Sequence, residues 1–198
     1  NNNITNNSYI TNVFLIITSA FIFLVLLIPL INYFGLIFDE LSISQVYKCI
    51  TLSYMASIVQ IRLSQWQIKK KAVSYSLLQI LISVINNLLS LLLIAKFDFK
   101  VDGRIDGIFY TYLMFFLFSI YSIKKDYLLS INDYDLKVIK TILVYGLSLT
   151  PHIIAGFFIT MSDRYVLNLY LGLSFVGLYM LSYQLMATIG MATDAINK

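Results

Sequence analysis

The feature that most constrains this chain is a series of uncharged stretches, each long enough to cross a lipid bilayer. Residues 1–38, 72–95 and 141–162 contain no Asp, Glu, Lys or Arg. A helix rises about 1.5 Å per residue, so about 20 apolar residues cross a hydrocarbon core of roughly 30 Å. Only 12% of the residues are charged, against about 25% in soluble domains. We therefore expect an all-α membrane protein.

About six transmembrane helices are expected, separated by polar or charged segments. Lys48 lies near the start of the second span, where its ammonium can reach the lipid headgroups. We place the boundary between the last two spans at residues 171–174, because Gly172 is a residue that readily ends helices. The predicted spans are residues 9–31, 42–61, 72–95, 108–123, 141–169 and 176–193.

The basic residues are unevenly distributed between the two sides of these spans. Of the 14 lysines and arginines, nine fall on one side if six spans alternate, four fall on the other, and Arg164 lies within a span. Cytoplasmic segments carry an excess of Lys and Arg. This rule predicts that residues 62–71 and 124–140, and both ends of the chain, are cytoplasmic. The segment 96–107 is then external.

Polar side chains follow one face of two neighbouring spans. Spacings of three and four residues keep side chains on one face of a helix. Lipid cannot hydrogen-bond an amide, so these faces should point at water or at other helices. They either line a hydrated cavity for a polar solute or hold helices together by hydrogen bonds. The third span carries Ser76, Gln79, Ser83, Asn86 and Ser90 with Asn87 beside them, and the second carries Ser53, Ser57, Gln60, Ser64 and Gln67.

The fifth predicted span contains the charged residues that are most unusual at membrane depth. His152 and Asp163 fall near one face, about three helical turns apart, and Pro151 removes one backbone donor, which can open the helix. Arg164 follows Asp163 directly. Arg164 is a candidate anion-binding residue, with Asp163 tuning it or binding a cation. The alternative is an ion pair that only fixes the depth of the helix.

Several other residues have simpler interpretations. Trp66 is expected to be an interface anchor, and residues 69–71, all lysine, are expected to contact anionic lipid, with a specific phosphate site as the alternative. Cys49 is the only cysteine, which excludes an internal disulfide. His152 is the only histidine, which excludes a histidine-rich metal site.

Signatures of the common enzyme classes are missing from the sequence. It has no glycine-rich phosphate loop, no His-Glu zinc pattern and no nucleophile elbow. We therefore expect a protein that is not an enzyme, with no cofactor and no metal. Coupling to a proton or sodium gradient is compatible with this expectation.

The last quarter of the chain resembles the polysaccharide flippases of the O-antigen translocase type, within the multidrug/oligosaccharidyl-lipid/polysaccharide exporter superfamily. Residues 146–152 read GLSLTPH, residues 162–165 read SDRY, and residues 171–179 read LGLSFVGLY, followed by Tyr183. These elements occur in the family's order, near the start of its second helix bundle. The departure is Ser148, where the family often has proline.

The resemblance implies an internal piece of a two-bundle transporter of 12 or more helices in the bacterial cytoplasmic (inner) membrane. Residues 1–140 would belong to the first bundle and residues 141–198 would begin the second. Such proteins flip a polyprenyl-diphosphate-linked oligosaccharide across the membrane by alternating access, for assembly of surface polysaccharide such as O-antigen or capsule. The partners implied are the lipid-linked oligosaccharide, membrane lipids, a polysaccharide polymerase and a chain-length regulator, with no nucleic acid. The candidate substrate-pathway residues are Arg164, Asp163, His152, Gln79, Ser83, Asn86, Asn87 and Gln60.

Two alternative functions have their own expected features. A drug/cation antiporter of the same superfamily would carry acidic residues inside the first bundle, and none falls within the first four predicted spans. A membrane polysaccharide polymerase or acyltransferase would usually have a large, charged external loop. The longest external segment here, residues 96–107, is short.

Overall fold

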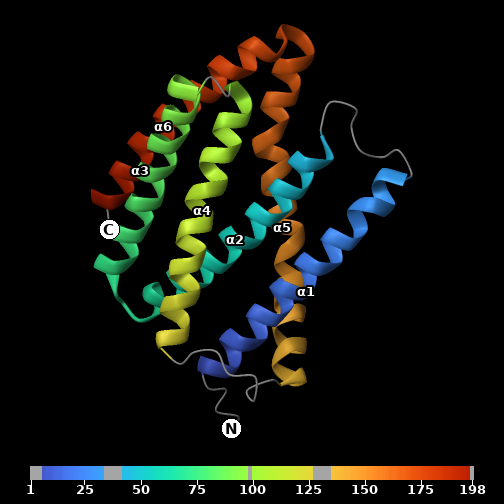
Figure 1. The fold of residues 1–198 in the computed structure, drawn as a ribbon, viewed down its shortest axis with the longest axis vertical. Helices are drawn as coiled ribbons and strands as arrows, with labels where there is room; N and C mark the ends of the chain where they lie inside the picture. Colours follow the sequence, from blue (N-terminus) through green and yellow to red (C-terminus); the bar gives the residue numbers. More distant parts are fainter. Residues whose placement is uncertain (1–5, 34–41, 98–99, 127–134, 197–198) are drawn as a thin grey trace. The chain divides into compact units, whose positions relative to one another are not determined.

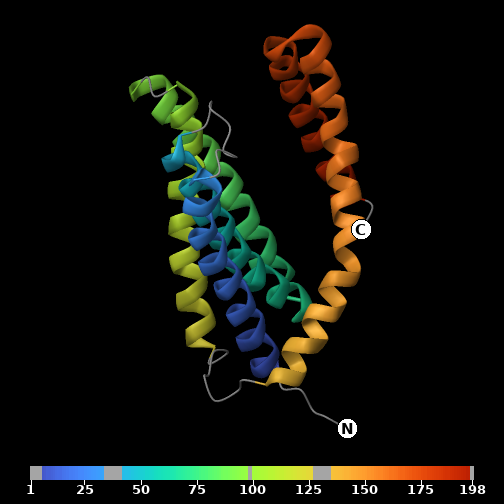
Figure 2. The same ribbon diagram turned by 90° about the vertical axis from the view of Figure 1, so that its right-hand side faces the viewer.

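A computed structural model describes residues 6–33, 42–97, 100–126 and 135–196, and all of the secondary structure in these ranges is helical. The chain divides into two compact units, Asn1–Ile142 and Leu143–Lys198. The helices are drawn in Figure 1 and, turned by 90°, in Figure 2. They are α1 (Asn6–Tyr33), α2 (Ile43–Ile68), α3 (Ala72–Phe97), α4 (Lys100–Lys125), α5 (Leu136–Leu171) and α6 (Leu173–Ile196).

Four of these helices are long and apolar enough to cross a membrane, which supports a multi-pass membrane protein. They contain the stretches Ser8–Tyr33, Ala72–Ala95, Asp102–Lys125 and Leu136–Leu171. The polar face, Lys48 and Arg62 lower the hydropathy of α2. The described apolar part of α6, Leu173–Tyr183, is shorter than a span. The two remaining spans therefore stay predictions.

Local sequence explains where several helices begin and end. Ser42 forms a capping box at the start of α2, because its hydroxyl accepts from the backbone N–H of Gln45 and the Gln45 side chain accepts from the backbone N–H of Ser42. Gly172 separates α5 from α6 with a φ of +83°, a conformation that costs glycine little. The turn predicted at residues 171–174 is confirmed. The helix α5 runs through Pro151, so the expected opening at that residue is wrong.

Helix α2 is the centre of the first unit, since it packs against α1, α3 and α4. Its contact with α1 includes Tyr54, which stacks on Phe21 at 4.5 Å between ring centroids. On its other side, the buried core joins three helices. The core residues are Val59, Leu63 and Trp66 of α2, Leu78 and Ile82 of α3, and Phe115 of α4.

Helices α3 and α4 approach closely at Gly107. A Cβ at this position would lie 2.5 Å from Ser90 Oγ and 2.8 Å from the Ser90 Cα and backbone nitrogen. This approach brings Arg104, one turn earlier on α4, within 2.9 Å of Ser90 Oγ through its Nη1. Glycine is therefore required here by contact between two backbones.

Helices α2 and α4 each extend at one end by about two turns beyond their predicted spans. Helix α4 begins at Lys100, not at residue 108, so Asp102, Arg104 and Asp106 lie on its first turns. Helix α2 continues to Ile68, not to residue 61, which places Trp66 inside the core. The expectation that Trp66 is an interface anchor is therefore wrong.

Candidate functional site

The polar faces of α2 and α3 meet at one groove in the first unit. This groove has a volume of about 370 Å³, and its lining includes Gln60 and Ser57 of α2, Gln79 of α3 and Tyr112 of α4. Two of the predicted pathway residues, Gln60 and Gln79, thus share one surface. Their amides can donate and accept hydrogen bonds at a depth where lipid offers neither.

The same polar face of α2 also borders α1. A second groove of about 690 Å³ lies between these two helices, and Ser57, Gln60 and Ser64 line it. Ser57 and Gln60 belong to both grooves. The polar strip of α2 is therefore open to two neighbouring spaces, one beside α1 and one beside α3.

The remaining predicted residues of α3 take two different roles. Ser83 is exposed on the helix surface. Asn86 accepts a long hydrogen bond of 3.4 Å from Ser90 Oγ, and Asn87 Oδ1 lies 3.4 Å from Arg104 Nη1. The end of the α3 polar face near Ser90 therefore contacts α4. At this end the polar side chains hold helices together and do not line a cavity.

In the second unit, Asp163 and Arg164 have different partners. The Tyr179 hydroxyl of α6 donates to Asp163 Oδ2 at 3.2 Å. The Arg164 guanidinium lies over the Tyr183 ring, 5.5 Å from its centroid, and contacts the Met161 sulfur. Arg164 Nε is buried and has no hydrogen-bond acceptor in the described part of the chain. The arrangement leaves Arg164 with donor capacity for an anion.

His152 lies about three turns before this pair on α5 and is exposed. The two units are separate bodies, so Arg164, Asp163 and His152 form one group of candidates, and Gln60 and Gln79 form another. Whether the two groups face one pathway stays a prediction.

A buried arginine on α2 was not among the predicted site residues. Arg62 is only 3% exposed. Its Nη2 pairs with Asp126 Oδ2 at 2.8 Å, its Nη1 donates to Gln65 Oε1 at 2.9 Å, and its guanidinium lies over the Trp66 ring. The hydrogen bond from Arg62 lowers the pKa of the Asp126 carboxyl, aided by the positive charges of Lys69 and Lys71. The i, i+3 spacing of Arg62 and Gln65 was the available sequence signal.

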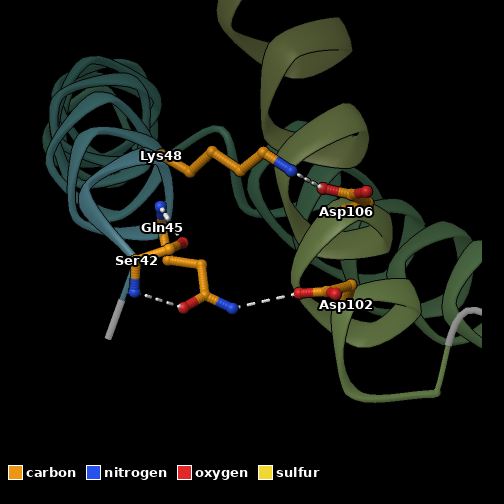
Figure 3. A network of polar contacts seen from close by, with 5 residues as sticks. All are labelled: Ser42, Gln45, Lys48, Asp102 and Asp106. Carbon is orange, nitrogen blue, oxygen red and sulfur yellow. Dashed lines mark hydrogen bonds and ion pairs between the residues drawn. The ribbon is translucent and has the colours of Figure 1, made fainter. Parts of the chain in front are cut away.

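A second polar network joins the first turns of α2 and α4 (Figure 3). Lys48 Nζ pairs with Asp106 Oδ1 at 2.6 Å, and Gln45 Nε2 donates to Asp102 Oδ1 at 3.1 Å. Gln45 Oε1 in turn accepts from the Ser42 backbone N–H at 3.2 Å. Lys48 therefore reaches a carboxylate on α4, which corrects the expectation that it extends toward the headgroups.

Comparison of this chain with protein-family models, with curated proteins and with solved structures finds no match. Its function is therefore inferred from its own side chains. The grooves of the first unit offer amides and hydroxyls, which suit the binding of a hydrogen-bonding solute.

Proposed function

We propose that this chain is part of a membrane transporter that flips a polyprenyl-diphosphate-linked oligosaccharide across the bacterial cytoplasmic membrane by alternating access. The observation that carries the proposal is the meeting of Gln60 and Gln79 at one groove lined by α2, α3 and α4. An oligosaccharide presents many hydroxyl groups, and a pathway through the bilayer must replace the water bound to them. Amide and hydroxyl side chains can do this without a net charge.

Arg164 supplies the complementary feature, a cation for the diphosphate. Its planar guanidinium can hold two phosphate oxygens at once. Its Nε lacks an acceptor among the described residues, and Asp163 bonds to Tyr179, so the guanidinium has a free donor for a ligand. The resemblance of residues 146–183 to the flippases supports the same assignment.

The drug/cation antiporter is the second candidate, and the start of α4 bears on it. Asp102 and Asp106 lie on this helix, so the first four helices do contain acidic residues. Asp106 is paired with Lys48 and Asp102 accepts from Gln45. A carboxylate already paired with an ammonium is a poor site for a transported cation, so we favour the flippase.

The experiment compares Arg164→Ala, Arg164→Lys and Asp163→Asn in cells that carry the full-length protein. Surface polysaccharide is measured per molecule of membrane-inserted protein. Arg164→Ala should abolish it, and Arg164→Lys should restore only part, because lysine keeps the charge but not the bidentate geometry. Asp163→Asn lowers transport at normal membrane levels if the carboxylate binds a driving cation. Normal polysaccharide per inserted Arg164→Ala molecule would refute the proposal for Arg164.

Gln79→Leu tests the groove of the first unit in the same cells. Its expected result is lower polysaccharide with nearly normal expression. Gln67→Leu is the matched control, because Gln67 is an exposed glutamine of α2 outside the groove shared by Gln60 and Gln79. If Gln79→Leu loses folded protein instead, the polar face serves helix packing.

A further inference from the structure

The groove between α1 and α2 has a cationic end and a polar strip along its length. Lys69 lines it where α2 ends, beside Lys70 and Lys71. Its volume of about 690 Å³ falls in the usual range of ligand pockets, about 300–1,000 Å³. Aliphatic side chains of α1, among them Val13 and Ile17, form the opposite wall. The groove is therefore amphipathic, with its positive charge at one end.

A buried donor without a partner lines the same groove. Gln65 is only 7% exposed, and its Nε2 has no acceptor among the described residues. The orientation of this amide follows from chemistry, because Arg62 can only donate and therefore requires the Gln65 oxygen on its side. The amide nitrogen is left to find an acceptor elsewhere. A buried donor in this state is stabilised by any ligand that brings an oxygen to it.

The polar strip continues away from this end of the groove. Ser64, Gln60 and Ser57 follow at helical spacing along α2, and Gln60 lies nine residues before Lys69, about 13 Å along the helix axis. An acyl chain lying here would leave the Gln60 amide and the Ser64 hydroxyl facing hydrocarbon, which is unfavourable. The Ser57 hydroxyl already donates to the Ser53 carbonyl at 2.8 Å and keeps its oxygen as an acceptor. A ligand that carries hydrogen-bonding groups along its length would satisfy these groups.

We propose that the α1–α2 groove binds the diphosphate-sugar headgroup of a polyprenyl-linked substrate before it is translocated. The phosphate oxygens accept from the Lys69 ammonium and from Gln65 Nε2. The sugar hydroxyls bond to the Gln60 amide and donate to the Ser57 hydroxyl oxygen, and the aliphatic wall of α1 contacts the apolar faces of the sugar rings. This inference rests on the proposed function and adds a binding site in the first unit.

The test measures protection of a cysteine placed in the groove. The full-length protein carries Cys49→Ser and Ser64→Cys and is reconstituted in vesicles of phosphatidylethanolamine and phosphatidylglycerol. The probe is polyprenyl diphosphate bearing one N-acetylglucosamine. It should slow labelling of Ser64→Cys by a small thiol reagent, and should leave Ser76→Cys unaffected. Ser76 is the matched control, because it is an exposed serine of α3 that lines a different hollow.

Two charge variants identify the groups that hold the phosphates. Gln65→Glu keeps an oxygen for Arg62 but replaces the free donor with negative charge, so it preserves packing and repels the probe. Charge-assisted hydrogen bonds of this kind correspond to roughly tenfold or more in affinity, and protection should need that much more probe. Lys69→Gln should act in the same direction. Lys124→Gln, an exposed lysine of α4, is the control and should change nothing.

The other outcomes distinguish failure of the groove from failure of the proposed function. Equal protection when phosphatidylglycerol alone is raised would make the groove a general phospholipid site. If Ser64→Cys is not protected in a protein that still flips the probe, the probe does not bind in the groove, and the proposed function stands. If protection persists in both Gln65→Glu and Lys69→Gln, these side chains do not bind the phosphates. Protection in a protein that never flips the probe would keep the site and refute the flippase.

Discussion

Substitution of Gly107 by alanine should destabilise the first unit, although alanine is the better helix former. The new Cβ would lie 2.5 Å from Ser90 Oγ and 2.8 Å from two Ser90 backbone atoms. Ordinary carbon contacts are about 3.5–4.0 Å. The serine hydroxyl can rotate away, but the α3 backbone cannot, so α3 and α4 must separate by about 1 Å, an estimate that follows from the same contact distance.

The expected change in the free energy of unfolding is the difference between two opposed effects. Overpacking of this kind typically costs about 1–3 kcal/mol, and replacing glycine in a helix gains up to about 1 kcal/mol. Separation of the helices also lengthens the 2.9 Å hydrogen bond from Arg104 to Ser90. We expect a net loss of about 1–2 kcal/mol from these terms.

The assay is reversible unfolding in mild detergent by titration with dodecyl sulfate, followed by circular dichroism. The matched control is Gly156→Ala on α5, where an added Cβ meets nothing within 4 Å and only the gain in helix propensity applies. A Gly107→Ala protein that is as stable as Gly156→Ala would refute the argument from the close approach.

Three further predictions concern charges and the turn. Lys48→Glu or Asp106→Lys alone should lower stability by about 0.5–1 kcal/mol, because this pair is partly exposed, and the double swap should recover most of it in the same unfolding assay. The hydrogen bond from Arg62 lowers the pKa of Asp126 in the folded protein. The pair therefore stabilises the fold fully above the pKa of an unfolded aspartate, about 4, and this stability is lost as the pH falls through the lower pKa of the folded state. Asp126→Asn should remove this part of the acid dependence when the free energy of unfolding is measured over a pH series. Gly172→Ala should cost about 1–2 kcal/mol for a left-handed backbone, seen as a lower midpoint of unfolding, and an unchanged midpoint would contradict it.

The hydrophobic lengths and the glycine turn could be predicted from the sequence because each has a local physical cause. Bilayer thickness fixes the length of an apolar stretch, so the spans at α1, α3 and α5 were expected near their observed positions. The φ of +83° at Gly172 is a property of one residue type. These features depend on neighbouring residues only.

Helix ends that carry charge could not be predicted in the same way. Asp106 falls in the predicted external segment 96–107, whereas in the structure it lies on α4 and is paired with Lys48 of another helix. Arg62 falls in the predicted cytoplasmic segment 62–71, whereas in the structure it is buried on α2 and paired with Asp126 and Gln65. Pairings between distant positions cannot be read from one sequence.

The polar face of each helix could be predicted from the sequence, but the groove that these faces form together could not. Periodicity placed Gln60 and Gln79 on polar faces, which is a statement about each helix alone. That the two faces meet in one groove, and that Ser90 at the end of one face contacts α4 instead, depends on how the helices pack. The order of α2 between α1 and α3 decides this, and no local pattern specifies it.

The two ion pairs of α2 and α4 also have a mechanical consequence. These helices run parallel, and they are joined by Lys48–Asp106 near their first turns and by Arg62–Asp126 near their last. A slide of one helix past the other by a single turn is about 5.4 Å, which would break both pairs at once and leave Arg62 buried without its counter-ion. Helices α2 and α4 should therefore move together as one rigid element. Helix α1 contacts α2 through the Phe21–Tyr54 stack, the 3.3 Å contact between the Thr18 and Tyr54 hydroxyls, and the cluster that joins Ile10 and Ile61. These contacts carry no charge, so we expect a change in the width of the groove beside α1 to cost less than a slide of α2 past α4.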